Sequence, residues 1–130
     1  MSERLLLDTH VILAIVQKEL PERFPEVARM LSQSTTTGYV SVASLWEIAI
    51  KTRLGKLAPS LPLLEIPDFL AASGLAILNI EAKHATTATD PEPETRDPFD
   101  RLLLAQCQIE GLRLVTIDRA LVDHPVAMKL

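Results

Sequence analysis

Four acidic residues in this sequence occupy positions from which their side chains could act together: Asp8, Glu47, Asp100 and Asp118. Each one either follows a predicted strand or lies in the first turn of a predicted helix. If these carboxylates meet, they repel one another strongly unless cations are present. Carboxylate-rich sites suit Mg²⁺ or Mn²⁺, which bind oxygen ligands and keep several waters. The acids therefore predict a divalent-metal site, without indicating by themselves which reaction it supports.

Each acid also has an ordinary structural explanation. Asp and Glu are favoured at helix starts because they accept hydrogen bonds from free backbone N–H groups and suit the helix dipole. This explanation is strongest for Glu47, because Ser44-Leu-Trp-Glu47 has the pattern of a capping box. It is weakest for Asp8, which ends a run of three leucines where a charge needs a reason. Taken singly, the residues leave both explanations open.

The elements that must position these acids alternate between strands and helices. Strands are expected over 4–8, 39–42, 75–80 and 112–117, with a last edge strand over 126–130, and helices over 9–18, 25–32, 44–54, 63–72, 81–89, 98–110 and from Asp118, with breaks at 35–38 and 90–96. Such alternation implies a mostly parallel sheet covered by helices on both faces. We therefore expect residues 1–130 to form one domain, a three-layer α/β/α sandwich, with ligands bound at the carboxyl ends of its strands.

The charge balance constrains any role in binding nucleic acid. With 17 acidic and 13 basic residues, the formal net charge is −4, the wrong sign for holding nucleic acid through the overall field. Such a role needs bound cations or a local basic rim. Lys51, Arg53 and Lys56 could form one, although they are equally well explained as a solvated helix end. Arg101, which adjoins Asp100, is the better candidate for a supporting role.

Several other classes of protein do not fit the sequence. No apolar run is long enough to cross a membrane, and no secretory signal is evident. The single cysteine, Cys107, cannot form an internal disulfide, which favours a cytoplasmic location. The four glycines are not spaced as a phosphate-binding loop, and the three histidines lack the spacing of a zinc site. A serine hydrolase elbow is also absent.

The acids lie in four segments that span nearly the whole chain: Leu5-Leu-Leu-Asp8-Thr-His10, Val42-Ala-Ser-Leu-Trp-Glu47-Ile-Ala-Ile-Lys51, Arg96-Asp-Pro-Phe-Asp100-Arg-Leu-Leu-Leu-Ala-Gln106 and Val115-Thr-Ile-Asp118. In their content and order these segments resemble motifs of the PIN-domain family, and specifically of the VapC-type toxins of bacterial toxin–antitoxin pairs. The second and third are far more specific than any single acid.

The resemblance implies a sheet of about five parallel strands and a Mg²⁺- or Mn²⁺-dependent endoribonuclease. Family members are usually homodimers, often act on tRNA or rRNA, and are silenced by a VapB-type antitoxin. The four acids named above match the family's catalytic and metal-binding acids, and Thr116 matches the hydroxyl residue of the last motif. Asp97 matches a possible fifth acid, although we favour its reading as a cap for the helix from Pro98. Thr95 departs from close relatives, which often carry histidine there.

The resulting hypothesis is hydrolysis of RNA by a metal-activated water. One alternative is a catalytically silent PIN-like module that only binds a partner. Another is a phospho-aspartate receiver or phosphatase, although His10 stands where a phosphatase needs its second Asp. A receiver would also need a second acid near Asp8 and a lysine near the last strands, and neither is evident. The RNA substrate, the number of metal ions and the oligomeric state are left open.

Overall fold

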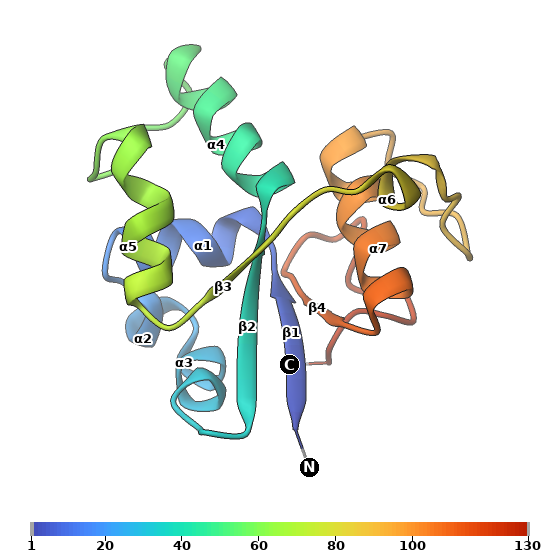
Figure 1. Ribbon diagram of the computed structural model, residues 1–130, viewed down its shortest axis with the longest axis horizontal. Coiled ribbons are helices and arrows are strands. Elements are labelled where there is room, and N and C mark those ends of the chain that lie inside the picture. The colour runs from blue at the N-terminus through green and yellow to red at the C-terminus, as the bar shows by residue number, and fades with distance from the viewer. Residues whose placement is uncertain (1, 130) are drawn as a thin grey trace.

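The computed structural model describes residues 2–129 and places four parallel strands in one sheet (Figure 1). The strands are β1 (Glu3–Leu7), β2 (Thr36–Ser41), β3 (Ala76–Leu78) and β4 (Arg113–Val115), in the spatial order β3-β2-β1-β4. On the central strand β1, Leu5 lies opposite Gly38 of β2 and Arg113 of β4. The predicted α/β class with a parallel sheet is therefore confirmed.

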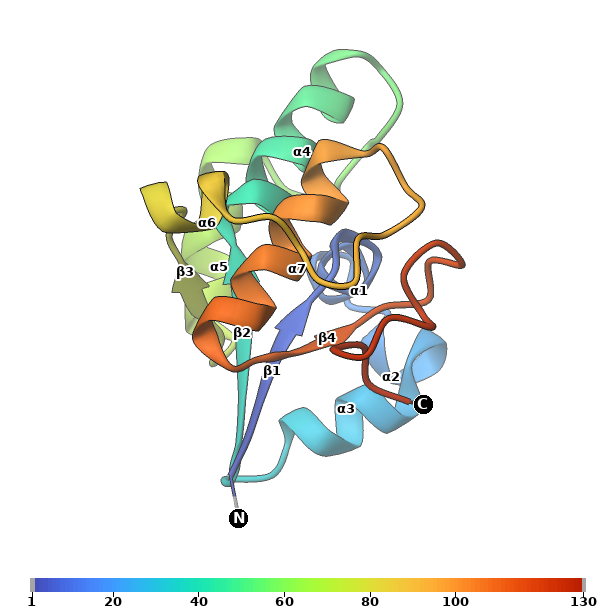
Figure 2. The ribbon, with the colours of Figure 1, turned by 90° about the vertical axis from the view of Figure 1, so that its right-hand side faces the viewer.

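Helices surround this sheet on both faces (Figures 1 and 2). They are α1 (Thr9–Val16), α2 (Leu20–Arg23), α3 (Pro25–Leu31), α4 (Val42–Arg53), the 3₁₀ turn η1 (Leu63–Glu65), α5 (Ile66–Ala72), α6 (Ala82–Thr86) and α7 (Pro98–Glu110). Within residues 2–129, none of these helices has the length and apolar character needed to span a membrane.

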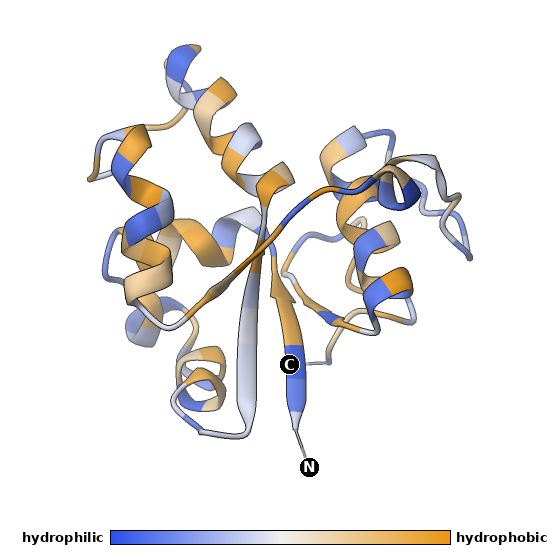
Figure 3. Cartoon of the chain, viewed as in Figure 1, coloured by the Kyte–Doolittle hydropathy of each residue, from blue (hydrophilic) through white to orange (hydrophobic). Residues whose placement is uncertain are grey.

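The three leucines of β1 show why the fold has three layers. Leu5, Leu6 and Leu7 are all fully buried, and successive side chains of a strand point to opposite faces. Leu5 and Leu7 belong to a core cluster with residues of α1, α3 and α5, whereas Leu6 belongs to a second cluster with Leu103 and Leu104 of α7. Figure 3 shows the change along β1 from a hydrophilic beginning to this hydrophobic end. An unbroken apolar run is typical of a strand covered on both faces.

The order of the strands fixes where a site can form. The chain adds β2 and then β3 on one side of β1, and places β4 on the other side. The strand order therefore reverses at β1, and ligands of open parallel sheets bind outside the carboxyl ends of strands at such a point. Asp8 follows β1 directly.

The prediction of a last edge strand over 126–130 is wrong. Its described part forms one isolated parallel bridge, in which Leu114 pairs with Ala127. The N–H of Leu114 donates to Val126 O (2.9 Å), and the N–H of Met128 donates to Leu114 O (2.8 Å). Because β4 is itself three residues long, it offers little backbone for a longer ladder. Residue 130 lies outside the described residues.

The other differences are local. The predicted break at 35–38 is wrong, because β2 begins at Thr36 and runs through Gly38. A Cβ at Gly38 would lie 2.7 Å from Leu75 Cδ2 and 2.8 Å from Leu31 Cδ2, so this glycine serves close packing. The helix expected from Asp118 is a series of turns, and the helix expected over 81–89 is confined to α6. The short helix α2 has no counterpart among the expected elements.

Candidate active site

All four predicted acids line one pocket at the carboxyl ends of β1 and β2. This acid pocket has a volume of about 70 Å³ and is lined by Asp8, Thr9, His10, Glu47, Lys51, Asp97, Asp100, Leu103 and Asp118. The lining residues come from the starts of α1 and α7, from the middle and last turn of α4, and from the turn after β4. A pocket of this size suits an ion with a few waters better than a large organic ligand.

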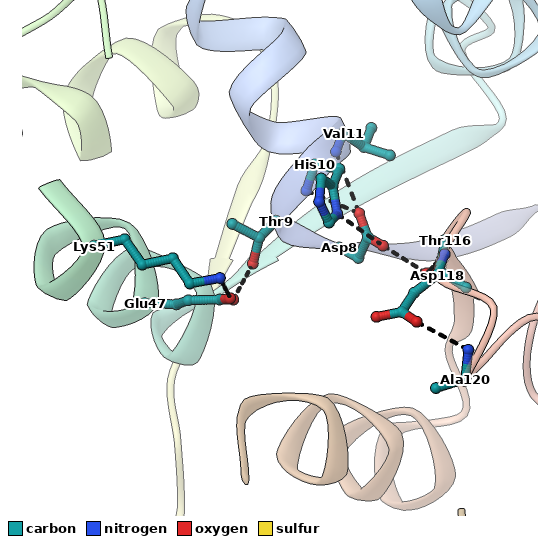
Figure 4. A network of polar contacts seen from close by, with 9 residues as sticks. All are labelled: Asp8, Thr9, His10, Val11, Glu47, Lys51, Thr116, Asp118 and Ala120. Carbon is teal, nitrogen blue, oxygen red and sulfur yellow. Dashed lines mark hydrogen bonds and ion pairs between the residues drawn. The ribbon is translucent and has the colours of Figure 1, made fainter. Parts of the chain in front are cut away.

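Asp8 is both a helix cap and a wall of the acid pocket. Its Oδ1 accepts hydrogen bonds from the N–H groups of His10 (3.0 Å) and Val11 (3.2 Å) at the start of α1. Its Oδ2 accepts from the hydroxyl of Thr116 (2.5 Å), as Figure 4 shows. Burial raises the pKa of Asp8, although the Thr116 hydrogen bond opposes this shift. The carboxylate that follows three buried leucines thus has hydrogen-bond partners on both oxygens.

The capping box predicted for Glu47 is wrong. Helix α4 begins at Val42, and its cap is Ser41, whose Oγ accepts from the N–H of Ala43 (3.0 Å). Glu47 therefore lies beyond the first turn and is free of any capping role. Its buried carboxylate accepts from the Thr9 hydroxyl at Oε1 (2.5 Å) and from Lys51 Nζ at Oε2 (2.6 Å). The strongest structural explanation for this acid is thereby removed.

Asp97 and Asp100 divide the two possible roles at the start of α7. Asp97 is the cap, as favoured from the sequence, because its Oδ1 accepts from the N–H of Phe99 (2.8 Å) and of Asp100 (3.4 Å). Asp97 also lines the acid pocket, so the cap and a place in the site are not exclusive. Asp100 caps nothing and accepts from the hydroxyl of Thr95 (3.3 Å). Thr95 is thus in contact with a site acid.

Burial and the crowding of negative charge act together on Asp100. Its half-buried side chain has a pKa raised from 3.8 to about 7. Burial is the largest cause, and the charges of Asp97, Asp118 and Glu47 follow in that order. A carboxylate whose pKa is raised by other carboxylates marks a place where positive charge is favoured.

Thr116 connects the first and last acids. While its hydroxyl donates to Asp8, it accepts from the N–H of Asp118 (3.0 Å). Asp118 Oδ1 in turn accepts from the N–H of Ala120 (2.9 Å), which closes the turn after β4 (Figure 4). Thr116 is buried and fixes the relative positions of these two acids.

A comparison with protein families now identifies the fold. A family model described as the PIN domain matches residues 5–126. The chain belongs to the PIN-domain family. Among solved structures, the chain is similar to a toxin–antitoxin complex from Klebsiella pneumoniae, with 19% identity, a TM-score of 0.63 and 95% of each chain covered. Comparison with curated proteins gives no match.

Arg101 does not reach the acid pocket of this PIN domain. Its Nη1 pairs with Glu92 Oε1 (2.6 Å), and its Nε donates to Thr95 O (3.0 Å). The guanidinium therefore holds the loop before α7, and it lines a different hollow, beside His84 and Thr89. Arg101 follows Asp100 directly in the sequence, but successive residues of a helix project in different directions. Its side chain therefore lies on a different side of α7 from that of Asp100.

A hydrogen-bond chain that the sequence did not reveal joins the two helices on either side of the acid pocket. The Ser41 hydroxyl donates to Gln106 Oε1 (2.6 Å), and Gln106 Nε2 donates to Asn79 O (3.3 Å). Gln106 is fully buried in α7. This contact ties the start of α4 to α7, the two helices that carry Glu47 and Asp100.

Thr9 and Lys51 are the pocket residues whose contacts sequence reasoning missed. The sequence groups Lys51 with Arg53 and Lys56 as a basic helix end, but of these three only Lys51 lines the acid pocket, and the other two are exposed. Its hydrogen bond to Glu47 raises the pKa of Lys51. The four-residue spacing from Glu47 to Lys51 was a usable signal, since side chains so spaced meet on one helix face.

A second group of potential ligands lies between α6 and α7, outside the acid pocket of the PIN domain. In the described part of the chain, Glu81, His84 and Glu110 are the one such group with ligand atoms all within 4.8 Å of one another. However, His84 Nδ1 accepts from the N–H of Glu81 (2.9 Å), so Nε2 carries the proton and donates to Glu110 Oε2 (2.7 Å). Neither nitrogen is available to a metal, and we interpret the group as a structural hydrogen-bond network that connects α6 and α7.

The acid pocket fits a divalent ion by the chemistry of its donors. It offers carboxylate oxygens, which Mg²⁺ and Mn²⁺ prefer, and the charges of neighbouring acids add to the effect of burial in raising the pKa of Asp100. Within residues 2–129, no three of these acids have ligand atoms that all lie within 4.8 Å of one another. Sharing one ion therefore requires side-chain rotation, or waters between the ion and some of the acids.

The pKa of Asp100 gives a pH dependence of stability. Because its pKa is about 7 in the folded protein and 3.8 as the ordinary value, the folded state binds the extra proton between these limits. In a metal chelator, stability should therefore fall as the pH rises from 6 to 8, by about 1 kcal/mol after allowance for solvent screening. Urea unfolding of the wild type and of Asp100→Asn at both pH values measures this change in the free energy of unfolding. An equal pH dependence in the two proteins would contradict this assignment.

Proposed function

We propose that this PIN domain is a Mg²⁺- or Mn²⁺-dependent endoribonuclease of the VapC type, acting as the toxin of a toxin–antitoxin pair. PIN domains are generally nucleases, which supports hydrolysis of a phosphodiester bond. The observation that carries the proposal is the convergence of Asp8, Glu47, Asp100 and Asp118 on one pocket. The similar fold of a toxin–antitoxin complex supports the toxin role and a VapB-type antitoxin as partner.

In this proposal Asp8, Glu47 and Asp100 hold the principal ion, and Asp118 supports it or a second one. A bound ion of this kind lowers the pKa of a coordinated water and neutralises charge on the scissile phosphate. The chain's own residues keep the acids in position: Thr116 holds Asp8, and Thr9 holds Glu47. No covalent nucleophile is needed.

The same ions explain how a chain of net charge −4 attracts an RNA backbone, since a loaded acid pocket presents positive charge to phosphate. We take tRNA and rRNA as the substrates to test first, and a homodimer as the assembly. The antitoxin would act by covering or distorting the acid pocket. Sedimentation of the purified protein, alone and with the product of a neighbouring antitoxin gene, tests both assemblies.

The deciding experiment is cleavage of total RNA with and without divalent ions. We expect EDTA to reduce cleavage by at least about 100-fold, and added Mg²⁺ or Mn²⁺ to restore it, because the acids cannot polarise water without the ion. Full activity in EDTA would contradict the metal mechanism. RNA binding without cleavage under all conditions would favour the silent module, and labelling of Asp8 by acetyl phosphate would favour the phospho-aspartate alternative.

A further inference from the structure

Lys51 is the one side chain with a permanent positive charge among the described residues that line the acid pocket. It faces a lining with Asp8, Glu47, Asp97, Asp100 and Asp118. Any anionic substrate that approaches this pocket meets acids on most sides, and Lys51 is the permanently positive side chain of the lining that can attract it. The position of this lysine therefore matters to whichever phosphate enters.

The contact that Lys51 makes is with a proposed metal ligand. Its Nζ lies 2.6 Å from Glu47 Oε2, and the other carboxylate oxygen of Glu47 accepts from Thr9. Both oxygens of this carboxylate are thus engaged. Each of these oxygens keeps a second lone pair, but a divalent ion that binds Glu47 lies close to the Lys51 ammonium, so the two cations repel each other and compete for this carboxylate.

The two partners differ in their freedom to move. The Glu47 side chain is 10% exposed, whereas that of Lys51 is 42% exposed. Lysine carries its charge at the end of four methylene groups and can change partner at little cost, but Glu47 is held by Thr9 as well. Lys51 is therefore the partner that is freer to move when a cation binds Glu47, and its charge would stay at the edge of the acid pocket, which Lys51 lines.

We infer that Lys51 is an internal counter-ion that competes with the divalent metal for Glu47 and, once displaced, binds the scissile phosphate of the RNA. This inference rests on the proposed function and adds a phosphate-binding residue to it. It predicts effects of opposite direction on metal binding and on RNA cleavage. Removing the Lys51 charge should strengthen metal binding and weaken RNA cleavage, whereas a purely structural lysine would not strengthen metal binding.

The first measurement is the affinity for Mn²⁺ without RNA, by titration calorimetry. Lys51→Met should bind Mn²⁺ about fivefold more tightly than the wild type, the effect of removing one partly exposed ion pair. Arg29→Met is the matched control, because Arg29 also lies in the last turn of a helix but is exposed and outside the pocket. It should change the affinity by less than about twofold.

The second measurement is RNA cleavage at saturating Mn²⁺. Lys51→Met should lower kcat/KM by about 10- to 100-fold, as expected for loss of a charged hydrogen bond to phosphate. Lys51→Arg should recover part of this, and Arg29→Met should cleave as the wild type does. Equal Mn²⁺ affinity in Lys51→Met and the wild type, or equal cleavage, would overturn the inference alone. A wild type that binds no Mn²⁺ would overturn the proposed function as well.

Discussion

Replacing Asp8 with asparagine should lower RNA cleavage at saturating Mg²⁺ by about 1000-fold or more while the protein stays folded. The amide removes the negative charge offered to the metal. It keeps an oxygen that can accept from the N–H groups of His10 and Val11, so the cap of α1 survives. Thr116 can rotate its hydroxyl to accept from the new amide instead of donating to Asp8.

Asp8→Ala separates the two roles of this residue. It should be as inactive as Asp8→Asn, but it should also lose about 1–2 kcal/mol of stability because α1 loses its cap. Cleavage rates and urea unfolding of both variants provide the comparison. Wild-type cleavage by Asp8→Asn would remove Asp8 from the proposed metal site. Equal stability of the two variants would show that the cap contributes little.

Replacing Asp100 with asparagine should have opposite effects on activity and on stability. Cleavage should fall by about 100- to 1000-fold, because a metal-binding charge is lost. In chelator at pH 8, stability should rise by about 1 kcal/mol, because the variant no longer holds a carboxylate whose pKa burial and Asp97 raise to about 7. Asp100 caps no helix, so little is lost in exchange.

Asp68→Asn is the matched control for this experiment. Asp68 also lies in the first turn of a helix, α5, but it is exposed and outside the acid pocket. Its replacement should leave cleavage unchanged and should not stabilise the protein at pH 8. If Asp100→Asn were less stable than the wild type in chelator at pH 8, the raised pKa of Asp100 would be contradicted. If it cleaved RNA normally, Asp100 would not be part of the proposed metal site.

Local chemistry in the sequence determined much of the fold. Leu5, Leu6 and Leu7 required a strand buried on both faces, and Asp97 before Pro98 set the start of α7. Family motifs and strand ends together indicated which acids to examine, and the structure brings all four to one pocket. These features depend on neighbours along the chain, on periodicity or on the geometry common to parallel sheets, and they are readable without coordinates. The catalytic role of the acids stays a prediction.

Only the tertiary structure decided which partners the side chains take. It moved the cap of α4 from Ser44 to Ser41, separated Lys51 from its basic neighbours, and turned Arg101 toward Glu92. It also reduced the last edge strand to one bridge. Each outcome depends on which distant segment lies opposite a given side chain, as Thr9 does for Glu47. Sequence spacing limits the directions in which a side chain can point, but packing between segments selects the atom that it meets.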